Sequence, residues 1–446
     1  MFVVRFVRIK CQADILRPDF NSAEVGCNVS LSQDIPLSNE GVSSSSWSKH
    51  DTSWMLSLFG TAVGAGILFL PINIGIGGFW PLIIMACLAF PMTFLAHRGL
   101  ARFVLSSKNK EADFTDVVEE HFGVNAGRLI SLLYFLSIFP ILLIYGVGLT
   151  NTVDSFMVNQ LGMESPSRVV LSGVLVAVMI GLMMGGERLM LRAFAILVYP
   201  LVGILFFLSL YLIPSWQMPD TTLPGLGSFS KTLWLSIPII VFSFSHAAAI
   251  SSFVNKQRSH YGDLATSKSE AILKRTSLLL ITFVLLFVFS CVLSLTGDQM
   301  AEAKAANVSV LSYLANITEN SFIATLGPLV AFIAIMSSFL GHFLGARESF
   351  TGLVTKHSSM RPKVADKVGA VLMFFAIWFC AVKNPSILDM MDQLSGPIIA
   401  MILFIMPMIA VYKVPSLQKY RNRLSTLFVL AVGSLAVCAL LYSMLS

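Results

Sequence analysis

Two short stretches of small and polar residues interrupt apolar segments of this chain, and both have the composition of a solute site. The first is GTAVGAG, residues 60–66, inside an apolar run over residues 54–71. Glycine costs about 1 kcal/mol relative to alanine in a helix interior, so we expect this helix to unwind at mid-depth. Backbone unwound in a bilayer needs a partner, and half-helix ends offer N–H groups to an anion and carbonyl groups to a cation. The alternative is close helix packing, which small residues also permit.

The second stretch is SFSHAAA, residues 243–249, inside the apolar segment 232–254. Serine and histidine are costly against lipid, so they are expected to face the protein interior or a cavity. Pro238 lies upstream and has no N–H for the helical ladder. For a proton-coupled process, the candidate titrating groups are His246 and His342, because histidine titrates near neutral pH. A structural role is the alternative for each histidine.

Three hydroxyl side chains are further candidates. Ser337 and Ser338 are adjacent in the apolar segment 322–345, and their hard oxygen atoms suit an alkali cation, although serine can also bond back to its own helix. Tyr134 lies in the segment 129–153 and could contact a ligand from an inward face, although packing is the commoner role for a buried tyrosine. The sequence contains no Walker A loop, HExxH, GxSxG in a strand–turn–helix setting or Cys/His cluster. An enzyme, an ATP-driven pump, a metal ion and an organic cofactor are therefore not expected.

The elements that must position these residues are transmembrane helices. Of the 446 residues, 56% are hydrophobic and only 12% are charged, and the mean hydropathy is +0.79, well beyond a soluble domain. We predict an all-α polytopic membrane protein with about eleven transmembrane helices. The apolar segments of spanning length cover residues 54–71, 79–97, 129–153, 168–185, 194–213, 232–254, 276–296, 322–345, 368–382, 396–412 and 425–445.

The positive charges predict the orientation. One set of loops holds most of the lysine and arginine residues, whereas the alternate loops hold only Arg168, Lys231, Lys304 and Lys383. The first set is therefore cytoplasmic, which places the N-terminus in the cytoplasm and the C-terminus in the periplasm. The formal charge of +6 follows from this bias, so the expected surroundings are the lipid bilayer and no nucleic acid partner is inferred.

Two corresponding interruptions predict an internal repeat. The first and sixth segments have weak centres and each opens a run of five segments, which is the pattern of an inverted-repeat transporter. We predict a first repeat over residues 52–213, a second over 231–412 and an extra helix over 425–445. The transporter domain is residues 51–446, and residues 1–50 form a disordered cytoplasmic tail, because they show no sustained period.

Several strings then resemble a known family. DTSWMLSLFGTAVGAGILFLPINIGIGGFWPL, LAFPMTFLAHRGLARFVLS, VVEEHFG, MAEAKAANVSVLSYLAN, SFLGHFLGARE and GPIIAMILF resemble the hydroxy/aromatic amino acid permease family, and within it the bacterial serine and threonine proton symporters. The resemblance runs from about Trp47 to the C-terminus. It implies a secondary transporter of the amino acid-polyamine-organocation superfamily, with the five-plus-five fold of sodium-coupled leucine transporters and discontinuous helices 1 and 6.

The resemblance also implies roles for individual residues. In that fold a substrate carboxylate meets the unwound backbone of helix 1, and the substrate amino group meets the unwound part of helix 6. A coupling cation would lie between helices 1 and 8, held by carbonyl groups and hydroxyl groups. The corresponding residues here are Gly64, Ala65 and Gly66 for the carboxylate; Phe242, Ser243 and Phe244 for the amino group; and Gly60, Val63, Ser337 and Ser338 for the cation.

The chain departs from the serine branch inside the predicted site. The branch reads FSFNHSPIISSF in helix 6, where this chain reads FSFSHAAAISSF, so Ser245 replaces an asparagine. The branch also has Lys-Ser in helix 8 at Ser337 and Ser338. Loss of that lysine would favour sodium coupling or altered proton coupling, since a buried lysine titrates readily. The change at Ser245 would shift substrate choice.

The predicted function is proton-driven import of a small neutral amino acid, serine or threonine first, across the bacterial inner membrane by alternating access. Sodium coupling and an aromatic amino acid substrate are alternatives within the transporter class. A sensor that binds an amino acid without moving it is an alternative from another class. A channel is disfavoured, because no helix carries a sustained polar stripe.

Overall fold

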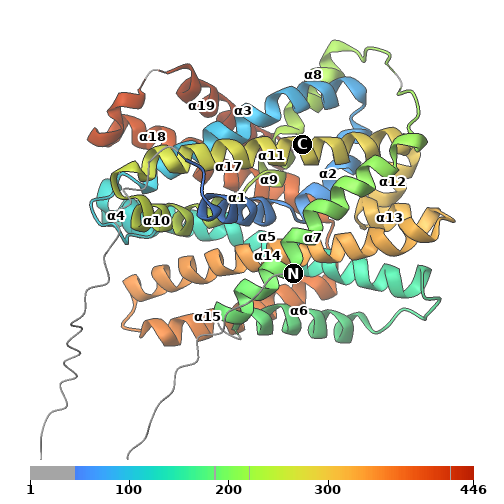
Figure 1. Ribbon diagram of the computed structural model, residues 1–446, viewed down its shortest axis with the longest axis horizontal. Coiled ribbons are helices and arrows are strands. Elements are labelled where there is room, and N and C mark those ends of the chain that lie inside the picture. The colour runs from blue at the N-terminus through green and yellow to red at the C-terminus, as the bar shows by residue number, and fades with distance from the viewer. Residues whose placement is uncertain (1–45, 185–186, 220, 422, 446) are drawn as a thin grey trace, which may run out of the picture. The chain divides into compact units, whose positions relative to one another are not determined.

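The computed structural model describes residues 46–445, with gaps at 185–186, 220 and 422. The predicted disordered tail lies almost entirely outside the described residues. Within them every regular element is a helix, as Figure 1 shows. The predicted all-α class is therefore confirmed.

The first five predicted spans are all present. The first is a bent pair, in which α1 (Lys49–Ala62) and α2 (Ala65–Ile76) meet at 54°. The next four spans are α3 (Phe79–Val104), α5 (Val124–Asn159), α6 (Arg168–Met184) and α7 (Glu187–Tyr211), with the short amphipathic α4 (Phe114–Phe122) before α5 and the 3₁₀ turn η1 (Ile213–Ser215) after α7.

The remaining six spans follow in the same order. The sixth is itself broken, and the tenth contains two π-helical turns. Their elements are α8 (Leu226–Leu235), α9 (Ile237–Ser243), η2 (Ala247–Ala249) and α10 (Ile250–Tyr261); η3 (Gly262–Leu264) and α11 (Ala265–Ser294); α14 (Ser321–His357); α15 (Pro362–Lys383); α16 (Ile387–Asp389), η4 (Met390–Ser395), α17 (Gly396–Ala400), η5 (Met401–Ile405) and α18 (Met406–Lys413); and, after η6 (Pro415–Tyr420), α19 (Leu424–Leu445). Two short helices, α12 (Gly297–Ala305) and α13 (Val310–Ile317), connect α11 to α14.

Length and composition support the number of spans. Seven described helical stretches are long and apolar enough to cross a membrane, and one of them, residues 226–294, contains two predicted segments. The bent pair α1–α2 is a further span, and α6 and residues 200–215 are shorter apolar helices. Each of the eleven predicted segments overlaps one of these stretches. The boundaries of the two repeats stay a prediction.

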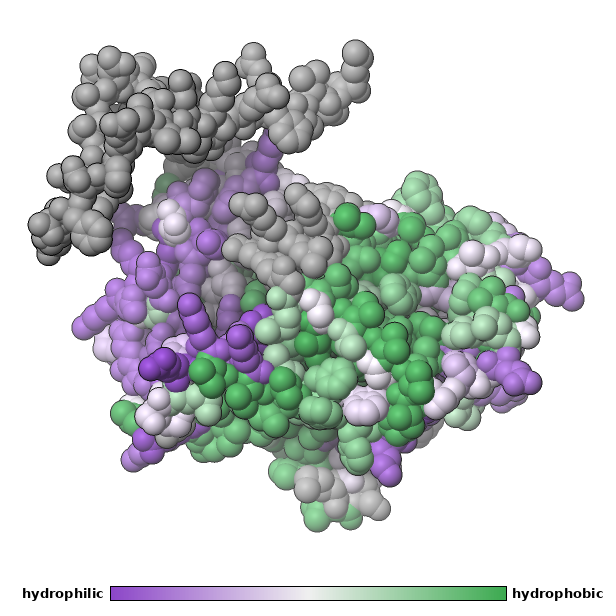
Figure 2. Space-filling model, turned by 90° about the horizontal axis from the view of Figure 1, so that it is seen from below, coloured by the Kyte–Doolittle hydropathy of each residue, from purple (hydrophilic) through white to green (hydrophobic). Residues whose placement is uncertain are grey.

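Apolar side chains cover the outside of the bundle. Figure 2 shows a broad hydrophobic face, with the hydrophilic residues gathered mainly toward one end. Val170 and Val174 on α6 and Phe375 and Phe379 on α15 are more than half exposed. Apolar surface of this extent is unusual for a soluble protein and fits contact with lipid chains.

The centre of the bundle is formed by α1, α5 and α14. Helix α14 packs against α1, α5, α7, α13 and α15, and α1 lies between α11 and α14 in Figure 1. The first and eighth spans are therefore neighbours, as a cation site between them requires.

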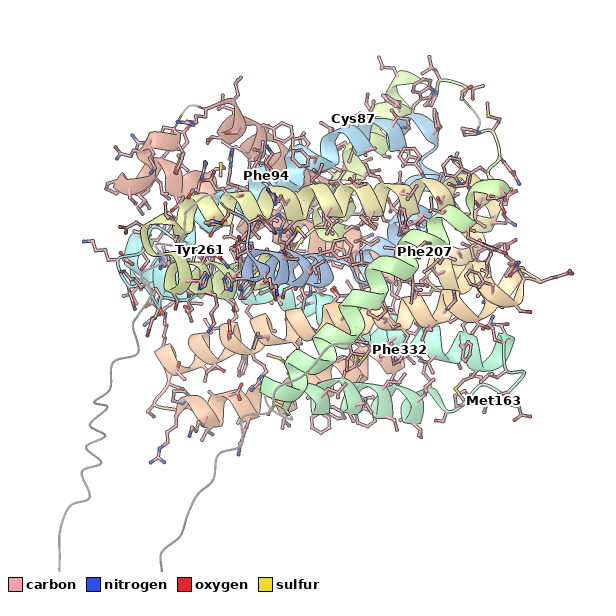
Figure 3. All side chains as sticks on the ribbon, in the orientation of Figure 1. Cys87, Phe94, Met163, Phe207, Tyr261 and Phe332 are labelled. Atoms are coloured by element: carbon pink, nitrogen blue, oxygen red, sulfur yellow. The ribbon has the colours of Figure 1, made fainter. Side chains whose placement is uncertain are left out.

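A buried ion pair fixes the start of α1. Asp51 is fully buried, and its Oδ2 lies 3.3 Å from the Nζ of Lys268 on α11. The hydroxyl of Tyr261, labelled in Figure 3, donates to Asp51 Oδ1 at 2.6 Å. Asp51 also completes a capping box with Ser48, which explains why the helix begins at Lys49, inside the range predicted as tail. These contacts tie the first span to α10 and α11.

Candidate functional site

The first span unwinds at the predicted residues. The helical ladder of α1 ends with the Val63 N–H donating to the Phe59 carbonyl at 2.9 Å, and it resumes when the N–H groups of Ile67 and Leu68 donate to the Gly64 carbonyl. As the first residues of a new helix, Ala65 and Gly66 have no intrahelical partner for their N–H groups. Gly64 is the N-cap of α2 and supplies no side-chain cap. This break therefore offers amide donors deep inside the protein.

The sixth span also unwinds at the predicted stretch. Helix α9 ends at Ser243, and the chain passes through Phe244, Ser245 and His246 without helical structure before η2 and α10 continue the span. The Phe244 N–H donates to the Ile240 carbonyl and closes α9, and the Ser245 N–H turns back to the Phe242 carbonyl, each at 3.1 Å. Residues 242–246 are all buried. The discontinuous helices 1 and 6 are therefore a feature of the structure.

The two breaks touch each other. The Ser243 hydroxyl donates to the Gly66 carbonyl at 3.0 Å. A Cβ on Gly66 would lie 2.8 Å from Phe242 Cε1 and from the Ser243 Cα, so only glycine allows this approach. The predicted residues of helices 1 and 6 thus form one contiguous cluster, which is closely packed in this structure.

Hydroxyl groups from two further spans close the cluster. Ser338 on α14 donates to the Thr61 carbonyl at 2.6 Å. Since its single proton is used there, the Tyr145 hydroxyl on α5, at 2.6 Å, donates to Ser338 Oγ. The Nδ1 of His342 lies 2.9 Å from the Ser338 carbonyl and donates to it. Ser338 therefore joins α1, α5 and α14 beside the Gly64 backbone.

Two predicted residues lie elsewhere. The Ser337 hydroxyl donates to the Ala334 carbonyl of its own helix at 3.1 Å, which is the alternative role considered for this serine. The Tyr134 ring stacks on Phe114, with ring centroids 4.1 Å apart. Tyr134 is eleven residues before Tyr145, or about 16 Å along the helix. The structure does not bring Ser337 or Tyr134 into the cluster.

A second histidine lies against His246. The rings of His97 and His246 stack with centroids 3.5 Å apart and planes 5° apart. The His97 Nδ1 donates to the Thr93 carbonyl at 2.7 Å, and its Nε2 accepts the His246 N–H at 3.0 Å. This pattern requires a neutral His97 ring. His246 donates from Nδ1 to the Phe244 carbonyl, while its buried Nε2 has no partner among the described residues.

Residues 52–445 match the model of the tryptophan/tyrosine permease family. The chain belongs to this family. The permease is 52% identical over 416 residues to the serine transporter SdaC of Escherichia coli strain K12, covering 91% of this chain and 97% of that one. It is 51% identical over the same length to the serine transporter SdaC of Shigella flexneri.

Solved structures with a similar fold are membrane transporters. The permease superposes on MhsT in complex with L-phenylalanine with a TM-score of 0.56 at 15% identity, covering 89% of this chain and 98% of that one. It superposes on a manganese transporter mutant of Eremococcus coleocola with a TM-score of 0.56 at 13% identity, covering 87% and 85% of the two chains. The predicted family, transporter fold and role in amino acid transport are confirmed, and the family membership confirms that the chain is not an enzyme.

Sequence reasoning missed two residues of the permease cluster. Tyr145 was recoverable, because it is nearer than Tyr134 to the middle of the predicted third span, where the helix breaks lie. His97 was not, because the predicted second span ends at that residue, whereas α3 continues to Val104. Nothing in the residues around His97 indicates the stack with His246.

Replacing Ser338 by alanine is expected to reduce both the stability and the activity of the permease. The change leaves the Thr61 carbonyl and the Tyr145 hydroxyl without their buried partner, which costs about 1–3 kcal/mol. Ser337→Ala is the matched control, since it removes only a hydroxyl bonded to its own helix and is expected to cost about 1 kcal/mol or less, below the loss in Ser338→Ala. Thermal unfolding in detergent and transport in vesicles measure the two effects. Equal behaviour of the two variants would contradict the assigned hydrogen bonds.

Proposed function

We propose that this permease imports serine, with threonine as a second substrate, by proton-driven symport across the bacterial inner membrane. The carrying observation is the pair of helix breaks that meet through Ser243 and Gly66. Their sequence lies within a chain 52% identical to a serine transporter. A small zwitterion suits this cluster, because glycine contacts leave no space for a bulky side chain near the backbone.

The proposed substrate contacts use the backbone groups of the two breaks. The N–H groups of the Gly64–Ala65–Gly66 turn bind the carboxylate, aided by the positive end of the α2 dipole. Carbonyl groups at Phe242, Ser243 and Phe244 bind the ammonium group. Ser245 is 4% exposed and is the proposed partner of the substrate hydroxyl.

The cation alternative has its own set of groups. Sodium would use the Gly60 and Val63 carbonyl groups together with Ser338, whose hydroxyl already contacts Thr61 on α1. Ser337 would have to turn away from Ala334 to take part. His246 and His342 remain the proposed histidine candidates for proton coupling, and both are buried beside the breaks.

Alternating access requires routes from both sides to the closed centre. A cavity of about 280 Å³ adjoins the end of α2 and is lined by Gly75, Gln217 and Met300 among others. A second, of about 560 Å³, adjoins α4 and the end of α14 and is lined by Asp113, Glu348 and Lys356 among others. These cavities support a pathway whose two ends open in turn. In the proposed orientation the first faces the periplasm and the second the cytoplasm, with the N-terminus in the cytoplasm and the C-terminus outside.

Uptake of labelled serine into proteoliposomes tests the proposal. A pH gradient, acidic outside, and a sodium gradient are imposed separately, and unlabelled amino acids compete. We expect accumulation with the pH gradient, and competition by serine and threonine but not by tryptophan, tyrosine or phenylalanine. Accumulation under neither gradient would contradict coupled serine transport, and competition by aromatic amino acids would favour the aromatic alternative.

A further inference from the structure

An acidic side chain lies inside the tenth span, away from the residues assigned above. Asp392 belongs to the π-helical turn η4, and its Oδ2 accepts a hydrogen bond from Asn73 Nδ2 at 2.8 Å. Its other oxygen, Oδ1, is buried and has no partner among the described residues. The Ser395 hydroxyl, in the same turn, is also buried without a described partner. Ionisable residues within spans are rare and mark ion pathways, and π-helical turns occur often at functional sites.

Little positive charge surrounds this carboxylate. The charged groups that act on it are Lys304 on α12 and Asp389 on its own span, and no ion pair within 4.0 Å is found for Asp392 in the described part of the chain. Among the helices packed on η4, α9 and α17 carry no titratable side chain, nor does α2, which supplies Asn73. The titratable residues on the other packed elements are Arg128, Tyr134, Tyr145 and Asp154 on α5, and Cys438 and Tyr442 on α19.

This environment favours a carboxyl group that binds a proton. A buried carboxylate with one neutral donor is costly, and such groups take up a proton in preference to remaining charged. A protonated Asp392 could donate a hydrogen bond. In this structure its Oδ1 and the Ser395 hydroxyl oxygen are both buried without a partner among the described residues. The stacked histidines are less suited to the same task, because a charged His246 would lie 3.5 Å from a His97 ring whose nitrogen atoms are both already bonded.

The position of Asp392 links it to the substrate cluster. Asn73 lies on α2, eight residues after Ala65, or about 12 Å along the helix. The N-terminus of this same helix forms the proposed carboxylate site. On the other side, Gly396 contacts the Pro238 carbonyl of α9, the helix that ends at the second break. A movement of α2 or α9 on substrate binding would therefore change the surroundings of Asp392.

We propose that Asp392 is the residue that carries the coupling proton, and this inference rests on the proposed proton symport. The proton enters from the periplasmic side, binds a carboxylate oxygen of Asp392 while the substrate binds, and leaves to the cytoplasm after the inward change. Asn73 is the positioning residue, because its amide holds one carboxylate oxygen in place. The only bond of the protein that forms and breaks in this cycle is the O–H bond of the protonated carboxyl group.

The test compares Asp392→Asn with Asp389→Asn in proteoliposomes that contain a trapped pH-sensitive dye. Asp389 is exposed and lies three residues earlier, so it is a matched control for the same chemical change. Two transport modes are measured: exchange of labelled for unlabelled serine at equal pH on both sides, and accumulation with a pH gradient. We expect Asp392→Asn to retain exchange within about threefold of wild type but to lose gradient-driven accumulation and serine-dependent proton entry. Asp389→Asn is expected to keep all three activities, and Asp392→Glu is expected to restore proton entry.

Several outcomes would overturn the inference. One is proton entry and accumulation by Asp392→Asn at the wild-type level. Another is loss of exchange together with accumulation in both Asp392→Asn and Asp392→Glu, since the carboxyl group would then serve structure or substrate binding. A sodium requirement in wild type that disappears in Asp392→Asn would identify a sodium site instead. Failure of the proposed function is distinct, because wild-type protein itself would then not accumulate serine with the pH gradient.

Discussion

Replacing Gly64 by alanine is expected to reduce serine uptake strongly. An alanine Cβ at this position would lie 2.5 Å from both the Cβ and the Oγ of Ser338, and 2.9 Å from the Tyr145 hydroxyl oxygen. These neighbours are held by their own hydrogen bonds, so the clash must be relieved by moving α1 relative to α14. Overpacking of this kind costs about 1–3 kcal/mol, and the displaced backbone is the proposed carboxylate site. We expect a fall in uptake of at least about tenfold, since 1.4 kcal/mol corresponds to tenfold in affinity.

Gly181→Ala provides the control for this experiment. Gly181 lies in α6, and a Cβ there would have no neighbour within 4 Å, so its replacement is expected to leave uptake and stability unchanged. Initial rates of labelled serine uptake, corrected for the amount of protein in the membrane, measure both variants. Uptake by Gly64→Ala at the rate of Gly181→Ala would mean that the break in helix 1 opens widely during transport or does not contact the substrate.

Hydropathy predicted the spans because burial in lipid constrains composition over a whole helix. Hydropathy could not predict the full lengths of the helices, because a helix can extend beyond the lipid into water, where its residues are polar. Helix α14 runs to His357, whereas the apolar segment was predicted to end at residue 345. The π-helical turns of the tenth span also left no trace in the sequence, since each adds only a local change in backbone hydrogen bonding. Asp392 lies outside the predicted span 396–412 because it, Gln393 and Ser395 are polar and interrupt the apolar run before Gly396.

The helix breaks were predictable, but the side chains around them were only partly so. Glycine and buried polar residues carry a local energetic cost, so the stretches at Gly64 and Ser245 could be recognised without tertiary information. Choosing Ser338 over Ser337, or Tyr145 over Tyr134, requires the rotation and depth of each helix. Those depend on packing between α1, α5 and α14, which no local pattern specifies.

The buried pair at the start of α1 leads to the second large effect. Asp51→Asn is expected to destabilise the permease by about 3–5 kcal/mol, because it removes the carboxylate that faces a buried ammonium group. The side chains of Asp51 and Lys268 are 0% and 8% exposed, so solvent offers little compensation. Asp116→Asn is the control: its carboxylate lies 2.8 Å from Lys356 but is 46% exposed, and a surface pair contributes about 0–1 kcal/mol. Thermal unfolding in detergent measures both variants, and equal stability would contradict a buried pair.

The double variant Asp51→Leu with Lys268→Met separates charge burial from packing. If the loss in Asp51→Asn comes from an uncompensated charge, removing both charges is expected to recover part of the stability. Transport is not expected to recover with the stability.

The ion pair connects the first span to α11, and the Tyr261 hydroxyl connects it to α10 through its bond to Asp51. We therefore expect the start of α1 to separate from these two helices more readily in the double variant. Accessibility of a cysteine placed at Ser48 to a membrane-impermeant thiol reagent, measured in a background without native cysteines, would report this opening. A double variant that is both as stable and as closed as wild type would show that apolar packing alone holds the start of α1.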